Sequence, residues 1–476
     1  MNRTPHTRSA AVLAAAIALA PAAALAAALG GVLSASPAFC AGVTLPPITR
    51  TTLKNGLTVI VLPTHRLPLV DFLLQVRTGS VADPPGREGL AGLTGDLLTQ
   101  GAGRRSARQI AEDIAFVGGE LAAESGEERL SVSCEVLKRD FAVGLELLRD
   151  VVVSPSFSRE EFERRKSEAL GAIASAKDDP DATAERELLP FLMGSHPLAH
   201  PVLGWDESVR KLTREDVVSF HRRHFTPDNA MLAVVGDVDP KAVVAALEAA
   251  FKEWRSPGES REPAYPPLAG VPRREVLLLS RPEATQSQIR MACPAVARNH
   301  PDFFPILVTN AILSGGFTSR LVNEIRVAQG LTYGISSRFR MQRGAGQFVI
   351  STFTRNETLR KTLDEVIKVV QALRTDGPTE EELVRAQRYL AGQFPRGLQA
   401  PDDLAAQLLN AEFYRLEPEY LQTFTARLAA VTLVDCRRAL KSYFCTDDLK
   451  LLVVTQPELG KTALEGLGPV RVKNPR

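Results

Sequence analysis

The sequence predicts an α+β protein made of two homologous domains, each a mainly antiparallel sheet packed with helices. Three observations support this: a segment repeated near the end of each half, a Pro-rich segment between the halves, and the same order of strand-like and helix-like runs in both. Of the 476 residues, 45% are hydrophobic and 24% are charged, which is typical of a soluble chain with buried cores. The composition excludes disorder, collagen and a disulfide scaffold as descriptions of the whole chain.

The internal repeat is clearest in two eleven-residue segments. Residues 225–235 read FTPDNAMLAVV and residues 444–454 read FCTDDLKLLVV, with five identical positions at a constant offset of 219. The starts of the halves also agree, because strand-like runs at 57–62 and 69–76 correspond to runs at 276–280 and 288–293. A duplicated α+β unit accounts for both matches.

Further strands and helices are predicted by local patterns. Residues 129–136 and 347–352 alternate β-branched and polar side chains, as strands do. N-cap residues mark four helices: Ser106 before 107–116, Ser158 before 159–177, Thr213 before a helix that opens with Glu215 and Asp216, and Thr379 before a helix that runs to about Phe394.

Composition also sets the predicted domain boundaries. The segment 256–272 contains five prolines and two glycines, which favours an extended, semi-rigid linker. We therefore expect a first peptidase-like domain at 46–255, a linker at 256–272, and a second such domain at 273–476. The basis for the term peptidase-like is a family resemblance given below.

The first 41 residues have the three-part pattern of a secretory signal peptide. Basic Arg3 and Arg8 precede an Ala/Leu-rich run from 10 to about 32, and small residues precede an expected cleavage after Ala38. We therefore expect secretion across the inner membrane to the periplasm. The alternative is an uncleaved N-terminal anchor that tethers the chain. The expected mature chain contains no further run that is long and apolar enough to span a membrane.

Charge and cysteine content narrow the function classes. The net charge is only +2 and no basic stripe occurs, so we expect no nucleic-acid partner. No Cys-x-x-Cys motif is present, which argues against a zinc finger or a redox motif. Cys134 and Cys293 lie in strand-like runs and are interpreted as core residues. The sequence leaves open whether Cys436 and Cys445 form a disulfide.

Several short motifs follow one another in a fixed order. They are Leu53-Lys-Asn-Gly-Leu57, Arg77-Thr-Gly-Ser80, Gly86-Arg-Glu-Gly-Leu-Ala91, Gly118-Gly119 and Val235-Gly-Asp-Val238 in the first half, and Ser314-Gly-Gly-Phe-Thr-Ser-Arg-Leu321 and Arg326-Val-Ala-Gln-Gly-Leu-Thr-Tyr333 in the second. In this order, and over nearly the whole expected mature chain, they resemble the pitrilysin/insulinase family of zinc peptidases in its two-domain, half-length form.

The resemblance implies a catalytic His-x-x-Glu-His helix, in which two histidines bind zinc and the glutamate polarises the zinc-bound water. In this chain Gly92 and Asp96 stand at the two histidine positions and Gly95 at the glutamate position. Ala172 stands where the family has its third ligand, and Arg165 replaces a supporting acidic residue. We therefore expect no catalytic residue and no bound metal or cofactor in this chain.

The remaining histidines provide no obvious substitute for the zinc site. His196 and His200 are four residues apart, but Pro197 between them favours a loop. His221 and His224 fall at a predicted helix end, where the helix dipole favours histidine. We interpret both pairs as structural.

One functional element of the family is retained. The resemblance implies that Arg326 and Tyr333, seven residues apart, bind the peptide substrate beside the scissile bond. We expect Arg326 in the last turn of a helix that starts near Ser319, Gly330 as a left-handed C-cap, and Tyr333 at the opening of the next strand. The two side chains would then donate hydrogen bonds to a carbonyl or a developing oxyanion.

The resemblance therefore implies a non-catalytic subunit of a heterodimeric metalloendopeptidase, in which a homologous partner chain carries His-x-x-Glu-His and the zinc. An alternative is an inactive peptide-binding or scaffold protein, for example one that adds a peptide strand at an exposed edge formed by 347–352. A third alternative is a zinc peptidase with relocated ligands. Dependence of peptidase activity on a partner chain separates the first two.

Overall fold

The computed structural model describes residues 44–256, 258, 263, 265–268, 270–271 and 273–475. The predicted signal peptide at 1–41, with its expected cleavage after Ala38, lies outside the described residues. So does part of the predicted linker at 256–272.

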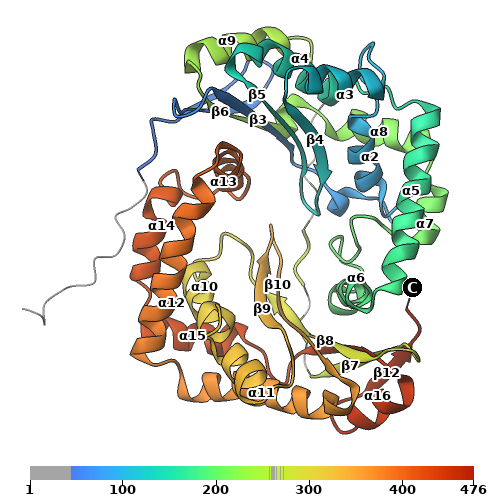
Figure 1. The fold of residues 1–476 in the computed structure, drawn as a ribbon, viewed down its shortest axis with the longest axis vertical. Coiled ribbons are helices and arrows are strands. Elements are labelled where there is room, and N and C mark those ends of the chain that lie inside the picture. The colour runs from blue at the N-terminus through green and yellow to red at the C-terminus, as the bar shows by residue number, and fades with distance from the viewer. Residues whose placement is uncertain are drawn as a thin grey trace, which may run out of the picture. The chain divides into compact units, whose positions relative to one another are not determined.

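The first half forms a six-stranded sheet with the order β1-β2-β6-β3-β5-β4 (Figure 1). Strands β2 and β6 are parallel, and the other neighbours are antiparallel. The strands are β1 (Thr49–Thr52), β2 (Thr58–Pro63), β3 (Leu69–Val76), β4 (Glu120–Ser125), β5 (Leu130–Leu137) and β6 (Ala230–Gly236). The helices are η1 (Ser80–Ala82), α2 (Leu90–Leu98), α3 (Ala107–Phe116), η2 (Lys138–Asp140), α4 (Phe141–Val153), α5 (Arg159–Asp178), α6 (Pro180–Met193), α7 (Asp206–Lys211), α8 (Arg214–His224), η3 (Pro227–Asn229) and α9 (Pro240–Ala250).

The second half forms a six-stranded sheet with the order β12-β7-β11-β8-β10-β9. Strand β7 is parallel to β12 and β11, and the other neighbours are antiparallel. The strands are β7 (Glu275–Ser280), β8 (Gln286–Ala295), β9 (Ile335–Met341), β10 (Gly346–Arg355), β11 (Lys450–Thr455) and β12 (Val470–Lys473). The helices are α10 (Phe303–Ser314), η4 (Val322–Ala328), η5 (Asn356–Thr358), α11 (Leu359–Asp376), α12 (Glu380–Gln393), η6 (Phe394–Leu398), α13 (Pro401–Phe413), α14 (Tyr420–Ala429), α15 (Leu433–Tyr443) and α16 (Pro457–Ala463).

The predicted α+β fold with two homologous domains is confirmed. Helices α8 and α15 are related by the offset of 219, and each begins with a capping box, in which Thr213 pairs with Asp216 and Thr432 with Asp435. Each of these helices leads into a buried strand, β6 or β11, that lies inside its sheet. The sequence repeat therefore marks the same helix–strand unit in both halves.

The four predicted helices are present because their caps satisfy the first free backbone N–H groups. Ser106 and Thr379 form capping boxes with Gln109 and Glu382, and the Ser158 side chain accepts from the N–H of Glu161. The short edge strands β1 and β12 were not predicted, because their four residues each show no alternation with a buried face.

The expectation that 347–352 forms an exposed sheet edge is wrong. These residues belong to β10, which pairs with β8 on one side and with β9 on the other. Alternating side chains identify a strand but do not reveal which strands flank it. The edge strand on this side of the sheet is β9, and β12 is the edge strand on the other side.

One helix of each half packs on the sheet of the other half (Figure 1). Helix α6 packs on β8 and β11 of the second sheet, and α13 packs on β3 and β6 of the first. Both helices begin with Pro followed by Asp, and the strand pairs that they cover occupy equivalent places in the two sheets. The exchange of these helices therefore follows the internal duplication.

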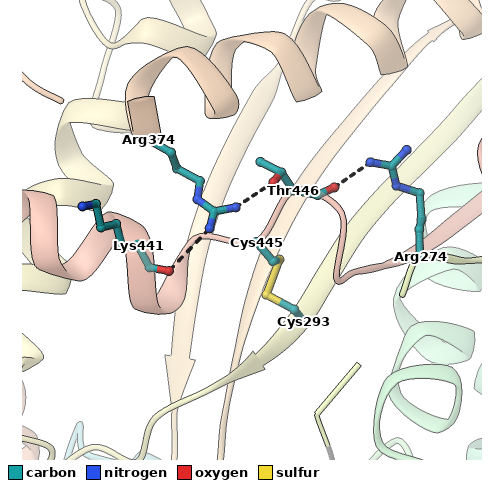
Figure 2. The surroundings of a disulfide bond; sticks show 6 residues. All are labelled: Arg274, Cys293, Arg374, Lys441, Cys445 and Thr446. Carbon is teal, nitrogen blue, oxygen red and sulfur yellow. Dashed lines mark hydrogen bonds between the residues drawn. A yellow bond between two sulfur atoms is a disulfide. The ribbon is translucent and has the colours of Figure 1, made fainter. Parts of the chain in front are cut away.

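A disulfide joins Cys293 on β8 to Cys445 in the loop before β11 (Figure 2). Arg374 and Arg274 hold this loop through Thr446, whose hydroxyl accepts at 2.6 Å and whose carbonyl accepts at 2.7 Å. Cys293 is a buried core residue, as the sequence predicts, but its disulfide partner was not predicted. The sequence did not determine whether Cys436 and Cys445 form a disulfide. Cys445 bonds to Cys293 instead, because the strand that follows Cys445, β11, pairs with β8.

Two other cysteines, Cys134 and Cys436, are free and buried among the described residues. In this part of the chain, no helix combines the length and the apolar character that a membrane crossing needs.

Candidate functional site

Helix α2 stands where the resemblance places the zinc-binding helix. It begins after Gly89, whose φ of +101° is a left-handed conformation that glycine adopts without strain. The Asp83 carboxylate accepts hydrogen bonds at 2.8 Å from the N–H groups of Gly89 and Ala91. Burial raises the pKa of Asp83 to about 8, although these two hydrogen bonds oppose the increase. The motif Gly86–Ala91 thus serves to start this helix.

The two glycines of the degenerate motif lie where α2 approaches its neighbours very closely. A Cβ atom at Gly92 would lie 2.7 Å from the carbonyl oxygen of Val202. A Cβ atom at Gly95 would lie 2.2 Å from Oγ of Ser125, whose hydroxyl donates to the Ala91 carbonyl. Both separations are far below van der Waals contact. A side chain at either position would therefore require Val202 or Ser125 to move.

Asp96, at the second histidine position, faces one cation, Arg165, and one carboxylate, Glu168, both from the neighbouring helix α5. Surrounding protein removes water from part of the Asp96 carboxyl and raises its pKa, and the positive charge of Arg165 opposes this effect. Arg165 also donates at 3.1 Å to Glu168 one turn later on α5. Ala172, at the third ligand position, is an exposed residue of α5 with no donor atom in its side chain. These residues do not fit a zinc ion.

Across the described ranges, no three or more His, Cys, Asp or Glu side chains converge in a way that would hold a metal ion. His196 and His221 each approach a backbone carbonyl at 2.9 Å, of Pro266 and Val152 respectively. Burial lowers the pKa of both His221 and His224 to about 4, so burial outweighs the helix-dipole effect expected from the sequence.

Arg326 lies on a helix, as the sequence predicts, and this helix, η4, is a π-helix. The N–H of Gln329 donates to the Glu324 carbonyl five residues earlier, at 3.0 Å. Gly330 then ends the helix with a φ of +60°, as the sequence predicts for a left-handed cap. π-Helical turns occur mostly as short insertions and are frequent at functional sites. The wider turn changes the direction of side chains relative to an α-helix of the same sequence.

Tyr333 lies two residues before β9, so it does not open that strand as expected. A local turn holds it outside the sheet. Oγ1 of Thr332 accepts from the N–H of Gly334 at 3.1 Å, and the hydroxyl of Thr352 donates to the Gly334 carbonyl at 2.9 Å. The Tyr333 side chain is 77% exposed as a result.

The structure brings Arg326 and Tyr333 together. The guanidinium carbon of Arg326 lies 4.5 Å from the centroid of the Tyr333 ring and 5.0 Å from that of Phe317. Contacts of this kind orient a guanidinium by cation–π attraction. Among the residues that the structure describes, no Asp or Glu forms an ion pair with Arg326. The charge of the pair is therefore left available to a ligand.

Phe317 is the member of this group that the sequence analysis missed. The only signal was its place after two glycines in the motif Ser314–Leu321, which contains no indication of contact with Arg326. The contact depends on how the loop after α10 packs beside η4.

Comparisons with known proteins agree on one family. The family model described as Insulinase (Peptidase family M16) matches residues 59–206, and the model described as Peptidase M16 inactive domain matches residues 211–390. The second match begins at residue 211 and therefore includes β6, which belongs to the first sheet. The boundary between the two family models thus differs from the boundary between the two sheets.

Curated relatives include uncharacterized zinc proteases from two bacteria. One from Mycobacterium tuberculosis is 30% identical over 385 residues, which cover 79% of this chain and 86% of that protein. One from Streptomyces coelicolor is 29% identical over 403 residues, which cover 82% and 86%.

Solved structures agree as well. The peptidase M16 inactive domain from Pseudomonas fluorescens is 27% identical with a TM-score of 0.81, covering 86% of this chain and 98% of that one. A Helicobacter pylori protease, at 18% identity, also has a TM-score of 0.81, covers 86% of this chain and 100% of that one, and shares the fold. The chain therefore belongs to the insulinase family, peptidase family M16.

Proposed function

We propose that this chain is the non-catalytic, Arg/Tyr-contributing subunit of a heteromeric insulinase-type zinc peptidase that degrades or processes peptides in the cell envelope. The partner is a homologous chain that carries His-x-x-Glu-His and holds the zinc ion. The observation that carries this proposal is the exposed contact between Arg326 and Tyr333.

The degenerate helix supports the division of labour between two chains. Gly92 and Gly95 are crowded by Val202 and Ser125 and carry no ligand atoms, while the second half keeps an ordered pair of hydrogen-bond donors. The exposed Tyr333 ring and the Arg326 guanidinium beside it are both accessible to a ligand.

The chemistry available to Arg326 and Tyr333 is hydrogen-bond donation. A guanidinium presents several N–H groups in a fixed plane, and a phenol presents one O–H group. Donors aimed at the oxygen where charge develops lower the barrier to peptide-bond cleavage. Stacking of Arg326 on Tyr333 holds these donors before the substrate arrives.

An envelope location is supported by the disulfide and by the predicted signal peptide. Structural disulfides persist in oxidising compartments and are rare in the bacterial cytosol. The Cys293–Cys445 bond therefore fits a periplasmic protein, either free or tethered by an uncleaved N-terminal anchor.

The test is reconstitution with the partner chain. The full chain is tagged, purified from its native cell envelope, and co-eluting chains are identified by mass. Peptidase activity of the pair is then compared for wild type, Arg326→Ala and Tyr333→Phe. We expect Arg326→Ala to reduce kcat by about 10²–10³-fold, as loss of one oxyanion-directed donor does. Tyr333→Phe removes one O–H donor and keeps the ring against Arg326.

Arg108→Ala is the matched control. Arg108 is an exposed residue of α3 that pairs only with Glu112 on the same helix, and we expect this variant to retain full activity. Zinc content and assembly should be unchanged in all variants. A pair that cleaves peptides equally fast without the Arg326 side chain contradicts the proposed role.

A second candidate is a peptide-binding or scaffold protein that acts without a catalytic partner. Strand β9 is an edge of the second sheet, and its residues Ser336 and Arg338 are exposed, so a peptide strand has access to this edge. Recovery of the chain without any zinc-bearing partner, together with peptide binding by the chain alone, favours this candidate.

A further inference from the structure

The loop after α10 holds an aromatic side chain outward beside Arg326. Phe317 is 69% exposed, and Gly316 before it has a φ of +104° that favours glycine. The Ser319 hydroxyl and N–H both donate to the Gly316 carbonyl, at 2.6 and 3.1 Å. The backbone of this loop is therefore fixed by its own hydrogen bonds.

The rings of Phe317 and Tyr333 both contact the Arg326 guanidinium, and both rings are more than two-thirds exposed. A third ring borders the same loop, since a Cβ atom at Gly316 would lie 3.9 Å from Cε2 of Tyr389. We call Phe317, Tyr333 and Tyr389 the aromatic patch. Clustered exposed rings are a typical mark of a binding surface.

The residue that follows Tyr333 lines a hollow of the protein. A cavity of about 350 Å³ is lined by Gly334, the residue after Tyr333, and by Ser336, Arg338 and Phe353 of β9 and β10. The three rings of the patch do not line this cavity, which also contains the charged side chains of Asp181, Glu185 and Arg290. Its lining is mixed, whereas the patch itself is apolar around one cation.

We infer that Phe317 is a specificity-determining residue, which packs against an apolar side chain of the bound peptide beside the carbonyl that Arg326 contacts. Arg326 supplies N–H donors for an acyl oxygen, and the Phe317 ring supplies an apolar surface next to them. Substrates with Phe, Leu or a similar side chain at this place should therefore be preferred over substrates with Ser or Asp. This inference rests on the proposed function, because it assigns a substrate class to the Arg/Tyr element.

The test measures binding by the full chain without its signal peptide. The probes are fluorescent, end-blocked ten-residue peptides that differ only at one central position, which is Phe, Leu, Ser or Asp. Wild type should bind the Phe and Leu probes about tenfold more tightly than the Ser probe, the size expected for one apolar contact with a ring. Phe317→Ala should reduce this ratio to within about twofold of one.

Three further variants distinguish a loss of preference between the probes from a general loss of probe binding. Phe317→Leu keeps apolar bulk and should keep most of the preference. Arg326→Ala removes the donor and should weaken all probes while leaving the ratio between them. Phe116→Ala is the matched control, because Phe116 is 92% exposed at the end of α3 in the first half, and it should change nothing.

The outcomes distinguish this inference from the proposed function. An unchanged probe ratio in Phe317→Ala overturns the inference, even where the reconstituted pair depends on Arg326. If Phe317→Ala binds the apolar probes and the Ser probe about equally, this result supports the inference, even where no zinc-bearing partner is recovered. Failure of the wild-type chain to bind any probe, or to distinguish Leu from Ser, also overturns it.

Discussion

Asp181 and Asp402 occupy the same place in the duplicated fold but meet opposite charges. Each follows the first proline of an exchanged helix, α6 or α13. Asp181 pairs at 2.5 Å with Arg290, a buried residue of β8 that also pairs with Glu185 at 2.9 Å. Asp402 instead faces Asp71, a buried carboxyl on the equivalent strand β3. One contact between the halves is thus an ion pair, and its counterpart is a group of carboxyls.

The carboxyl group predicts a pH-dependent stability. Burial, together with the negative charges of Glu135 and Asp402, raises the pKa of Asp71 to about 7. The folded chain therefore holds a proton between about pH 4 and pH 7 that the unfolded chain releases, so the free energy of unfolding should fall as the pH rises through this range and level off above it. Asp71→Asn should remove this slope and add on the order of 1–3 kcal/mol at pH 7.5. Urea unfolding from pH 4.5 to 8 measures both effects.

Glu135→Gln provides the control for that prediction. It removes a neighbouring negative charge, so the pKa of Asp71 should fall and the sloping range should move to lower pH. Equal slopes in wild type and Asp71→Asn would contradict the assignment of the proton to Asp71.

Close packing of α2 predicts a large cost for one added methyl group. Gly→Ala inside a helix normally stabilises by about 1 kcal/mol. At Gly95 the new methyl would meet Oγ of Ser125, so Gly95→Ala should instead destabilise by about 1–3 kcal/mol, as overpacking does. Adding Ser125→Ala should recover part of this loss. Gly171→Ala is the matched control, because Gly171 lies in α5 with no atom within 4 Å of its added Cβ, and it should stabilise. The free energy of unfolding in urea distinguishes these variants.

The same packing predicts that the lost zinc site cannot be restored by its ligands alone. The substitutions Gly92→His, Gly95→Glu, Asp96→His and Ala172→Glu together should give a less stable chain without stoichiometric zinc, because Val202 and Ser125 occupy the space. Metal analysis of the dialysed protein, with the thermal midpoint of unfolding, tests this. One tightly bound zinc per chain at unchanged stability would refute it.

The disulfide predicts a stability loss on removal. Cys293 and Cys445 are separated by 152 residues, and closing a loop of that size restricts the unfolded chain. Replacing both by Ala should cost about 4 kcal/mol. Cys436→Ala removes a buried free thiol and should cost less. Alkylation before and after reduction, read by mass, checks the pairing. Modification of Cys445 in unfolded, unreduced protein would count against it.

Local patterns were sufficient for most of the fold. Capping residues at Ser106, Ser158, Thr213 and Thr379 act within one turn, so the sequence marks these helices directly. The repeat at 225–235 and 444–454 likewise revealed the duplication, because each copy repeats the same helix–strand unit. The loss of ligands at Gly92 and Gly95 needed only the sequence order of the motif.

The sequence by itself determined the two-domain α+β fold and the family, and its motifs singled out the Gly92–Asp96 segment and the Arg326/Tyr333 pair as candidates. Only the tertiary structure decided that Phe317 contacts Arg326, that Cys445 pairs with Cys293, and that β10 lies inside its sheet. These features depend on which distant segments pack together, and the burial that shifts the pKa of Asp71 has the same origin. Spacing along the chain contains no record of such contacts, because they arise only when strands pair and the helices α6 and α13 are exchanged.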